Sequence, residues 1–176
     1  MAQSFLRIPS GRIAVLIGPK GKTKARIERD TKTRIEIDSS SGEISVDGKD
    51  GEKQHIAENI VKAIGRGFAP HKAMLLLSDD TAMSVIKLRE MLGKSEKAIK
   101  QKKARVIGTG GQVRNRIEKD TGCSVSVFGN TIAIIGRFDE IENAEFVINS
   151  ILEGANISTA FDMLKEKKME ERKFKL

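Results

Sequence analysis

The sequence has no tryptophan, no tyrosine and one cysteine, and each shortage excludes a class of protein. Because aromatic residues make up only 4%, we do not expect a platform of aromatic side chains on which nucleic-acid bases stack. The single Cys123 excludes an intramolecular disulfide framework and a zinc cluster built on cysteine pairs. Its place in the segment TGCSVSV predicts a small core or half-exposed residue of a strand.

Long apolar runs are also missing. No segment approaches the roughly 20 apolar residues that a membrane-spanning helix needs, and the N-terminal MAQSFLRIPSGR lacks the apolar stretch of a secretory signal. We therefore expect a cytoplasmic protein with no membrane contact. The two histidines, His55 and His71, lie far apart without a metal-binding or catalytic pattern, so no metal, cofactor or catalytic residue is expected.

Positive charge is abundant: 32 lysines and arginines face 24 acidic residues, which gives a net charge of +8. This excess favours polyanionic partners such as RNA, DNA or anionic lipid. Charged residues also make up 32% of the chain, and such a dense mixture is typical of a thermostable surface. Net charge alone therefore does not identify the partner.

One segment occurs twice. IGPKGKTKARIERDT at residues 17–31 recurs as IGTGGQVRNRIEKDT at residues 107–121, and the 90-residue shift has no gap. The copies share eight of fifteen residues, which are Ile17/Ile107, Gly18/Gly108, Gly21/Gly111, Arg26/Arg116, Ile27/Ile117, Glu28/Glu118, Asp30/Asp120 and Thr31/Thr121. Since 176 residues suffice for one large or two small domains, the repeat predicts two.

Each copy places a G-x-x-G turn at the start of a basic helix. Glycine permits backbone angles and close contacts that a side chain blocks, and the free N–H groups of a helix start favour a phosphate. Lys20 adds charge in the first turn, whereas Arg114 and Arg116 must supply it in the second. A single such turn is more often a plain joint between helices, but two in one context favour binding.

Hydrophobic periodicity predicts the same order of elements, β-α-α-β-β-α, in both copies. In the first copy we expect strands at 5–8, 34–38 and 43–47 and helices at 11–17, 22–31 and 52–68. In the second we expect strands at 83–88, 124–128 and 131–135 and helices at 94–107, 112–120 and 139–152. Further helices are predicted at 72–77 and from residue 157 onward.

The pattern I-G-x-x-G-x-x-x-x-x-I, followed by a hairpin and a long helix, resembles the type I KH domain. This module binds RNA and single-stranded DNA and holds about four nucleotides against its glycine loop. The resemblance covers residues 5–68 and 83–154 and implies an α+β fold with two type I KH domains. Each would have a three-stranded antiparallel sheet with helices packed on one face. We expect domains at 1–78 and 79–154, and a C-terminal helix and basic tail at 155–176.

The resemblance also implies a groove between the two helices flanking the loop, the next strand and the hairpin loop. Ile27 and Ile117 could line it but fit a core equally well. The candidate RNA-binding residues are Ala14, Ile17, Gly18, Pro19, Lys20, Gly21, Lys22, Lys24 and Ile35 in the first copy, and Ala104, Arg105, Ile107, Gly108, Thr109, Gly110, Gly111, Gln112, Arg114 and Val125 in the second.

Three charged features depart from or add to this pattern. KH domains usually have an apolar residue three positions after the second glycine, where this chain has Lys24 and Arg114. We expect both side chains to contact phosphates or base edges. The alternative is that they are helix-surface charges that point into water. Six basic residues at 94–105 form either a track for a nucleic-acid backbone or a solvated helix. The terminal KEKKMEERKFK is either a solvated end or a basic tail for RNA or protein contacts.

The segments GTGGQVRNRIEKDTG and FAPHKAMLLLSDD resemble the partner-of-Nob family of ribosome-assembly factors. This resemblance implies a non-catalytic, monomeric protein of archaeal type that binds single-stranded RNA near the 3′ end of small-subunit rRNA. The implied protein partners are a Nob-type endonuclease and other small-subunit assembly or initiation proteins.

Two alternatives remain. The chain could be a protein scaffold in ribosome assembly or translation initiation, with only one KH copy binding RNA. The helices at 72–77 and at the C-terminus would then be docking surfaces, although they could equally pack the domains together. An NTP-hydrolysing enzyme is disfavoured, because GPKGKT lacks the first glycine of a P-loop at Leu16 and follows a predicted helix.

Overall fold

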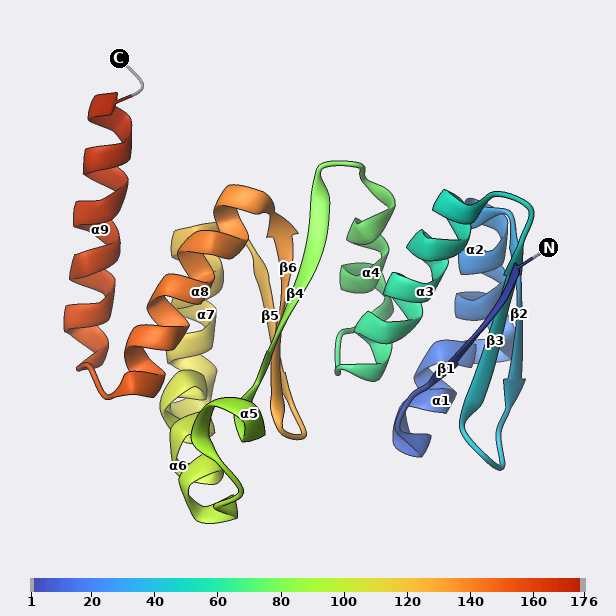
Figure 1. Ribbon diagram of the computed structural model, residues 1–176, viewed down its shortest axis with the longest axis horizontal. Coiled ribbons are helices and arrows are strands. Elements are labelled where there is room, and N and C mark those ends of the chain that lie inside the picture. The colour runs from blue at the N-terminus through green and yellow to red at the C-terminus, as the bar shows by residue number, and fades with distance from the viewer. Residues whose placement is uncertain (1, 175–176) are drawn as a thin grey trace.

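The computed structural model describes residues 2–174, with side chains from 4 to 173. The first unit comprises β1 (Ala2–Arg7), α1 (Ser10–Ile17), α2 (Lys22–Thr31), β2 (Thr33–Asp38), β3 (Glu43–Gly48) and α3 (Gly51–Gly65), followed by α4 (Pro70–Ala73) and the 3-10 helix η2 (Met74–Leu77). The second comprises β4 (Thr81–Lys87), α5 (Leu88–Leu92), α6 (Glu96–Ile107), α7 (Gln112–Thr121), β5 (Ser124–Phe128), β6 (Thr131–Arg137) and α8 (Phe138–Glu153), followed by α9 (Ile157–Phe174). Figure 1 shows these elements.

Each unit contains one three-stranded antiparallel sheet, with strand orders β1-β3-β2 and β4-β6-β5. The predicted α+β fold and the β-α-α-β-β-α order are therefore confirmed. Burial alternates along β2, where Ile35 is buried between the exposed Arg34 and Glu36. By contrast, all residues from Thr131 to Gly136 of β6 are buried, so this strand is covered on both faces.

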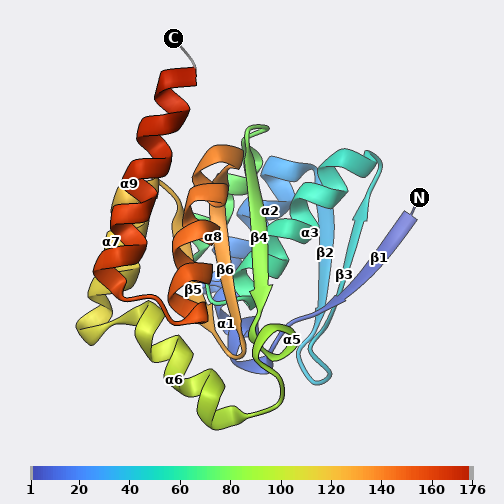
Figure 2. The ribbon, with the colours of Figure 1, turned by 60° about the vertical axis from the view of Figure 1, so that its left-hand side comes forward.

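The two units stack in layers, and this explains the double burial of β6. Moving from right to left in Figure 1, the first sheet is followed by the helices of the first unit, the second sheet, the helices of the second unit and α9. Ala133 and Ile135 of β6 belong to the same hydrophobic core as Ile60 of α3 and Leu76 of η2. The outer face of the second sheet is thus packed against the first unit, and Figure 2 shows the same order from another side.

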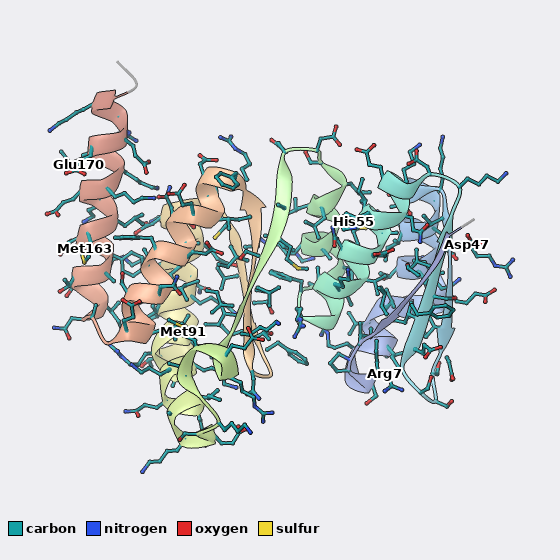
Figure 3. The ribbon with its side chains drawn as sticks, in the orientation of Figure 1. Arg7, Asp47, His55, Met91, Met163 and Glu170 are labelled. Carbon is teal, nitrogen blue, oxygen red and sulfur yellow. The ribbon has the colours of Figure 1, made fainter. Side chains whose placement is uncertain are left out.

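The short helix pair α4–η2 and the long helix α9 follow their units in corresponding places. Ala73 and Met74 are buried in the first core, and Ala160 and Phe161 are buried in the second. The guanidinium of Arg116 on α7 lies 3.9 Å from the centre of the Phe161 ring. On the outer side of α9, Met163 and Glu170 point away from α8 (Figure 3). The C-terminal helix is therefore docked on its inner side; Lys175 and Leu176 of the expected basic tail lie outside the described residues.

Several predicted boundaries were wrong. The expected 72–77 helix is split into α4 and η2, and α3 ends at Gly65 because Gly67 adopts a φ of 98°. The short helix α5 was not predicted, and α6 begins at Glu96 rather than at 94. Ser95 caps α6, since its hydroxyl accepts a hydrogen bond from the Ala98 N–H at 3.3 Å.

Arg12 lies at the seam between the units, which we define as the surface where β5 meets the first unit, and it contacts both of them. Its Nε donates a hydrogen bond to the carbonyl of Ile64, in the last turn of α3, at 2.8 Å. Its Nη2 donates to the carbonyl of Phe68, just past the end of α3, at 2.6 Å. The same guanidinium lies 5.7 Å from the ring centre of Phe128 on β5. Nearby, the Ser126 hydroxyl donates to the Arg66 carbonyl at 2.8 Å. These contacts fix β5 of the second unit on the first.

Replacing Arg12 by methionine should therefore destabilise the protein by about 2–4 kcal/mol, because two carbonyls lose a charged donor. Arg7→Met is the matched control, since Arg7 is exposed. Urea unfolding measures both changes. Equal stability of the two variants would contradict the assigned role of Arg12 at the seam.

Candidate nucleic-acid interface

The two G-x-x-G turns have the same backbone geometry. Gly18 has φ/ψ of 71°/176° and Gly108 has 71°/172°; Gly21 has 74°/9° and Gly111 has 79°/13°. In each turn the last glycine donates its N–H to the carbonyl of the first at 3.1 Å. The repeat in sequence is therefore a repeat in structure.

The first glycine of each turn is required by internal packing. A Cβ atom on Gly18 would lie 2.1 Å from the Thr23 hydroxyl oxygen, and one on Gly108 would lie 2.4 Å from Cγ2 of Val113. Both positions also have a positive φ, which side chains other than glycine rarely adopt. The first glycine thus lets the turn lie against the helix that follows.

The last glycine faces open space. A Cβ atom on Gly21 would meet nothing within 4 Å, and one on Gly111 would meet only the Arg114 guanidinium at 3.7 Å. Gly21 and Gly111 are also the N-caps of α2 and α7, and among the described residues no side chain caps either helix start. The N–H groups of Gly21 and Gly111 are bonded within the turns, as are those of Lys22 and Gln112. The open side of each last glycine nevertheless leaves room for an anion at the positive end of the helix dipole.

The candidate residues fall into three groups by exposure. The exposed ones are Ala14, Pro19, Lys20, Lys22, Ala104, Thr109, Gly110 and Gln112. The half-buried ones are Ile17, Gly18, Gly21, Lys24, Arg105, Ile107, Gly108, Gly111 and Arg114. The side chains of Ile35 and Val125 are only 1% and 5% exposed, so these residues can offer a ligand little beyond their backbone. Ile27 and Ile117 are fully buried, as the core alternative predicted.

A pair of glutamates holds the edge strand of each sheet to the helix after the turn. Oε1 of Glu28 accepts the Ile35 N–H at 2.8 Å, and Oε1 of Glu118 accepts the Val125 N–H at 2.8 Å. The sequence analysis did not predict these two hydrogen bonds, although both glutamates are among the eight identical residues of the repeat.

Lys24 and Arg114 occupy the same position in the two copies but differ in their partners. The Lys24 ammonium lies 2.9 Å from Oε1 of Glu28, so its charge is paired. Arg114 has no ion pair among the described residues; its Nη2 lies 3.3 Å from the Asn115 Oδ1, and its Nε is buried without a hydrogen-bond partner there. A buried donor of this kind usually has an acceptor, so the second site has an unused cationic donor beside its loop.

Lys20 is held in a strained conformation. Its φ is 52° in the left-handed region, whereas the second copy has Gly110, with φ 58°, at the same place. For a residue with a Cβ this conformation costs roughly 1–2 kcal/mol. The first loop therefore carries a positive charge at its tip at a cost in stability, and the second loop does not.

The basic helix α6 divides into two sets of charges. Lys102, Lys103 and Arg105 donate to main-chain carbonyls, with Lys103 Nζ 2.7 Å from the Gly129 oxygen and Arg105 Nη1 2.9 Å from the Ile151 oxygen. Arg105 thus binds the C-terminal end of α8, where a positive charge is favourable. The exposed Lys97 and Lys100 form the other set, and the exposed Lys94 lies just before the helix.

A P-loop follows a strand and begins with a glycine. Here the first turn follows helix α1, and the position of that glycine is the fully buried Leu16.

In residues 2–174, no three His, Cys, Asp or Glu side chains are grouped so that they could hold a metal ion. No helix in the same part of the chain is both long and apolar enough to cross a bilayer. Burial raises the pKa of the Cys123 thiol to about 11, consistent with a core residue.

The different roles of the glycines can be tested within one loop. Gly108→Ala should cost about 3 kcal/mol or more, since it adds a clash with Val113 to backbone strain. Gly110→Ala should cost only about 1–2 kcal/mol, because a Cβ there meets nothing within 4 Å. Chemical denaturation of both variants measures the difference, and equal losses would show that packing does not require the first glycine.

Comparison with known proteins agrees with this geometry. Residues 3–63 match the family described as "KH domain", and residues 82–169 match the family described as "Eukaryotic type KH-domain (KH-domain type I)". The KH domain-containing protein MJ0443 of Methanocaldococcus jannaschii is 38% identical over an alignment of 168 residues, and the match covers 93% of this chain and 73% of the relative.

Two solved structures from Pyrococcus horikoshii are similar along nearly the whole chain. Dim2p is 38% identical with a TM-score of 0.88, and the match covers 94% of this chain and 99% of Dim2p. The aDim2p chain of a complex with a/eIF2alpha and rRNA is 39% identical with a TM-score of 0.89, and the match covers 96% and 95% of the two chains. With two KH domains in the same arrangement and this level of identity, the chain belongs to the family of Dim2p/PNO1-like KH proteins.

Proposed function

We propose that this protein binds single-stranded RNA non-catalytically through both glycine loops and acts in assembly of the small ribosomal subunit, near the 3′ end of its rRNA. The observation that carries the proposal is the open space beside Gly21 and Gly111, where no protein atom other than the Arg114 guanidinium would meet an added Cβ. An RNA backbone can approach the main chain there closely, and no side chain has to move away first.

Charge near each loop supports a phosphate ligand. In the first unit Lys20 and Lys22 are exposed on the loop and at the start of α2. In the second unit the loop itself is neutral, and Arg114 supplies the nearby charge. We infer that Arg114 contacts phosphate or a base edge, since its half-buried guanidinium is bonded only to the neutral Asn115 among the described residues, whereas Lys24 must first leave Glu28 to do so. The groove sides would be Ala14 and Ile17 in one unit and Ala104 and Ile107 in the other.

The fixed stacking of the units supports joint use of the two sites. KH domains hold about four nucleotides each, so two sites cover roughly eight. Because the Arg12–Phe128 contact and the Ser126–Arg66 hydrogen bond tie the units together, binding at one loop raises the effective concentration of RNA at the other.

The role in ribosome assembly and the protein partners rest on the relatives. The similar aDim2p chain occurs in a complex with a/eIF2alpha and rRNA, and we extend RNA binding to this chain on that basis. The a/eIF2alpha in that complex supports an initiation protein as a partner of this chain. From the sequence resemblance alone, we further propose a monomeric cytoplasmic protein that acts beside a Nob-type endonuclease. A pure scaffold is less well supported, because η2 and α9 already pack on their own units through buried residues.

The groove model predicts a preference for unpaired RNA. The parent should bind an unstructured RNA oligonucleotide at least tenfold more tightly than a duplex of the same sequence, measured by fluorescence anisotropy. The double variant Gly21→Asp/Gly111→Asp should lose single-strand binding through charge repulsion and obstruction, while its circular dichroism stays unchanged. Parent-like affinity of this variant would exclude the glycine loops as the site.

Lys20 offers a test that separates strain from charge. Lys20 and Lys32 flank α2, and both adopt a left-handed conformation, with φ of 52° and 54°. Replacing either one by glycine removes that backbone strain and one positive charge. Both should change stability by no more than about 1 kcal/mol. Only Lys20→Gly should weaken RNA binding and flatten its salt dependence, by about 0.7 in the log–log slope for one lost phosphate contact. Equal affinities of the two variants would contradict a contact by Lys20.

A further inference from the structure

Helix α6 carries an exposed strip that leads to the second glycine loop. Lys97, Lys100, Gln101 and Ala104 are all exposed. Lys97 precedes Lys100 and Gln101 by three and four residues, and Ala104 follows them by four and three, which places the four on one face of the helix. The same face continues to Gly108 at the end of α6. Ala104 belongs to the proposed groove, so the two lysines extend the groove side toward the start of the helix.

The charges on this strip are unused within the protein. No hydrogen bond or ion pair to the ammonium groups of Lys97 and Lys100 occurs among residues 2–174, whereas Lys102, Lys103 and Arg105 of the same helix all bind carbonyls. The one acidic residue of α6, Glu96, is ion-paired to Arg89 of α5. It therefore does not neutralise the strip.

The first unit has no counterpart of this strip. At the 90-residue offset, Lys100 corresponds to Ser10, the first residue of α1, and Lys97 corresponds to Arg7 in β1. Helix α6 has 12 residues and α1 has 8. The additional turn of α6 follows α5, an insertion that carries the exposed Met91 (Figure 3) and ends at Gly93 with a φ of 75°. The second site is thus longer than the first.

The hairpin tip of the second unit indicates the path past the strip. Lys103 Nζ donates to the Gly129 carbonyl at 2.7 Å, so the β5–β6 tip meets α6 about one turn from Lys100. On the path that we infer, a strand that leaves the proposed groove along α6 passes Lys100 and then Lys97. Lysine is a flexible point charge and suits contacts to phosphates without regard to sequence.

We propose that Lys97 and Lys100 bind two phosphates of the RNA strand just outside the groove of the second unit. The strip makes the second site a groove of about four nucleotides plus a backbone track, whereas the first site is a groove alone. This inference rests on the proposed single-strand binding and assigns the additional contacts to one end of the bound strand.

The test uses Lys97→Gln/Lys100→Gln, which removes two charges but keeps chain length and helix propensity. The control is Lys165→Gln/Lys173→Gln on α9, which removes the same charge from two other exposed positions. The probes are an RNA of about eight nucleotides from the 3′ end of small-subunit rRNA, which fills both grooves, and the same RNA lengthened by about six nucleotides at its 5′ or its 3′ end.

The variant should bind the short RNA within about twofold of the parent. It should lose about 25-fold in affinity for one of the two lengthened RNAs at 0.1 M salt, with a log–log salt slope smaller by about 1.4, as expected for two phosphates at 0.7 each. The control should bind all three probes like the parent.

Parent-like binding of both lengthened RNAs by the Lys97→Gln/Lys100→Gln variant would overturn the track alone, provided that the parent binds the short RNA. An equal loss on the short RNA, or an equal loss in the control, would overturn it as well, since the effect would then be general. Failure of the parent to bind the short RNA would overturn the proposed function itself and the track with it.

Discussion

Open space beside the main chain at two helix starts is the constraint on which the proposed RNA binding depends. In both units the last glycine of the loop lies at the start of a helix, with a positive φ and open space where a Cβ would stand. The first glycine serves a different purpose, because it lets the loop pack on Thr23 or Val113. One glycine therefore builds the loop, and the other leaves it accessible to phosphate.

Given this shared geometry, the two sites differ in how they supply charge. The first places Lys20 at the loop tip in a strained conformation and pairs Lys24 with Glu28. The second has a relaxed, neutral loop, a cationic donor at Arg114 and the lysine strip of α6. The two copies of the fold thus supply positive charge to their sites in two different ways. Because phosphate contacts are sensitive to salt, the two sites should respond differently to ionic strength.

Much of the fold could be predicted from the sequence, since local patterns determine it. The repeat, the strand alternation and the glycine turns predicted the right element order. They left open whether Ile27 and Ile117 line a groove or the core, and the structure shows both in the core. The stacking could not be predicted in this way. The complete burial of β6 arises from packing against η2 and α3, which are far away in the sequence. Likewise, α5 is too short to leave a periodic signal.

The charges near the site were harder to assign than the fold. Sequence shows that Arg105, Lys102 and Lys103 are basic, but only the structure shows that they bind carbonyls of α8, the hairpin and the segment after α8. The same holds for Lys24, whose partner Glu28 is one helical turn away, and for the glutamates that hold the edge strands. A side chain's partner depends on tertiary geometry, and composition does not reveal it.

The central claim can be tested most directly by titrating the protein with a single-stranded RNA of about eight nucleotides and following backbone amide resonances by NMR. The account predicts that the largest shifts occur at Gly21 and the first turn of α2, and at Gly111 and the first turn of α7. Large shifts confined to other surfaces, such as the open face of the first sheet, with these amides unchanged, would contradict it.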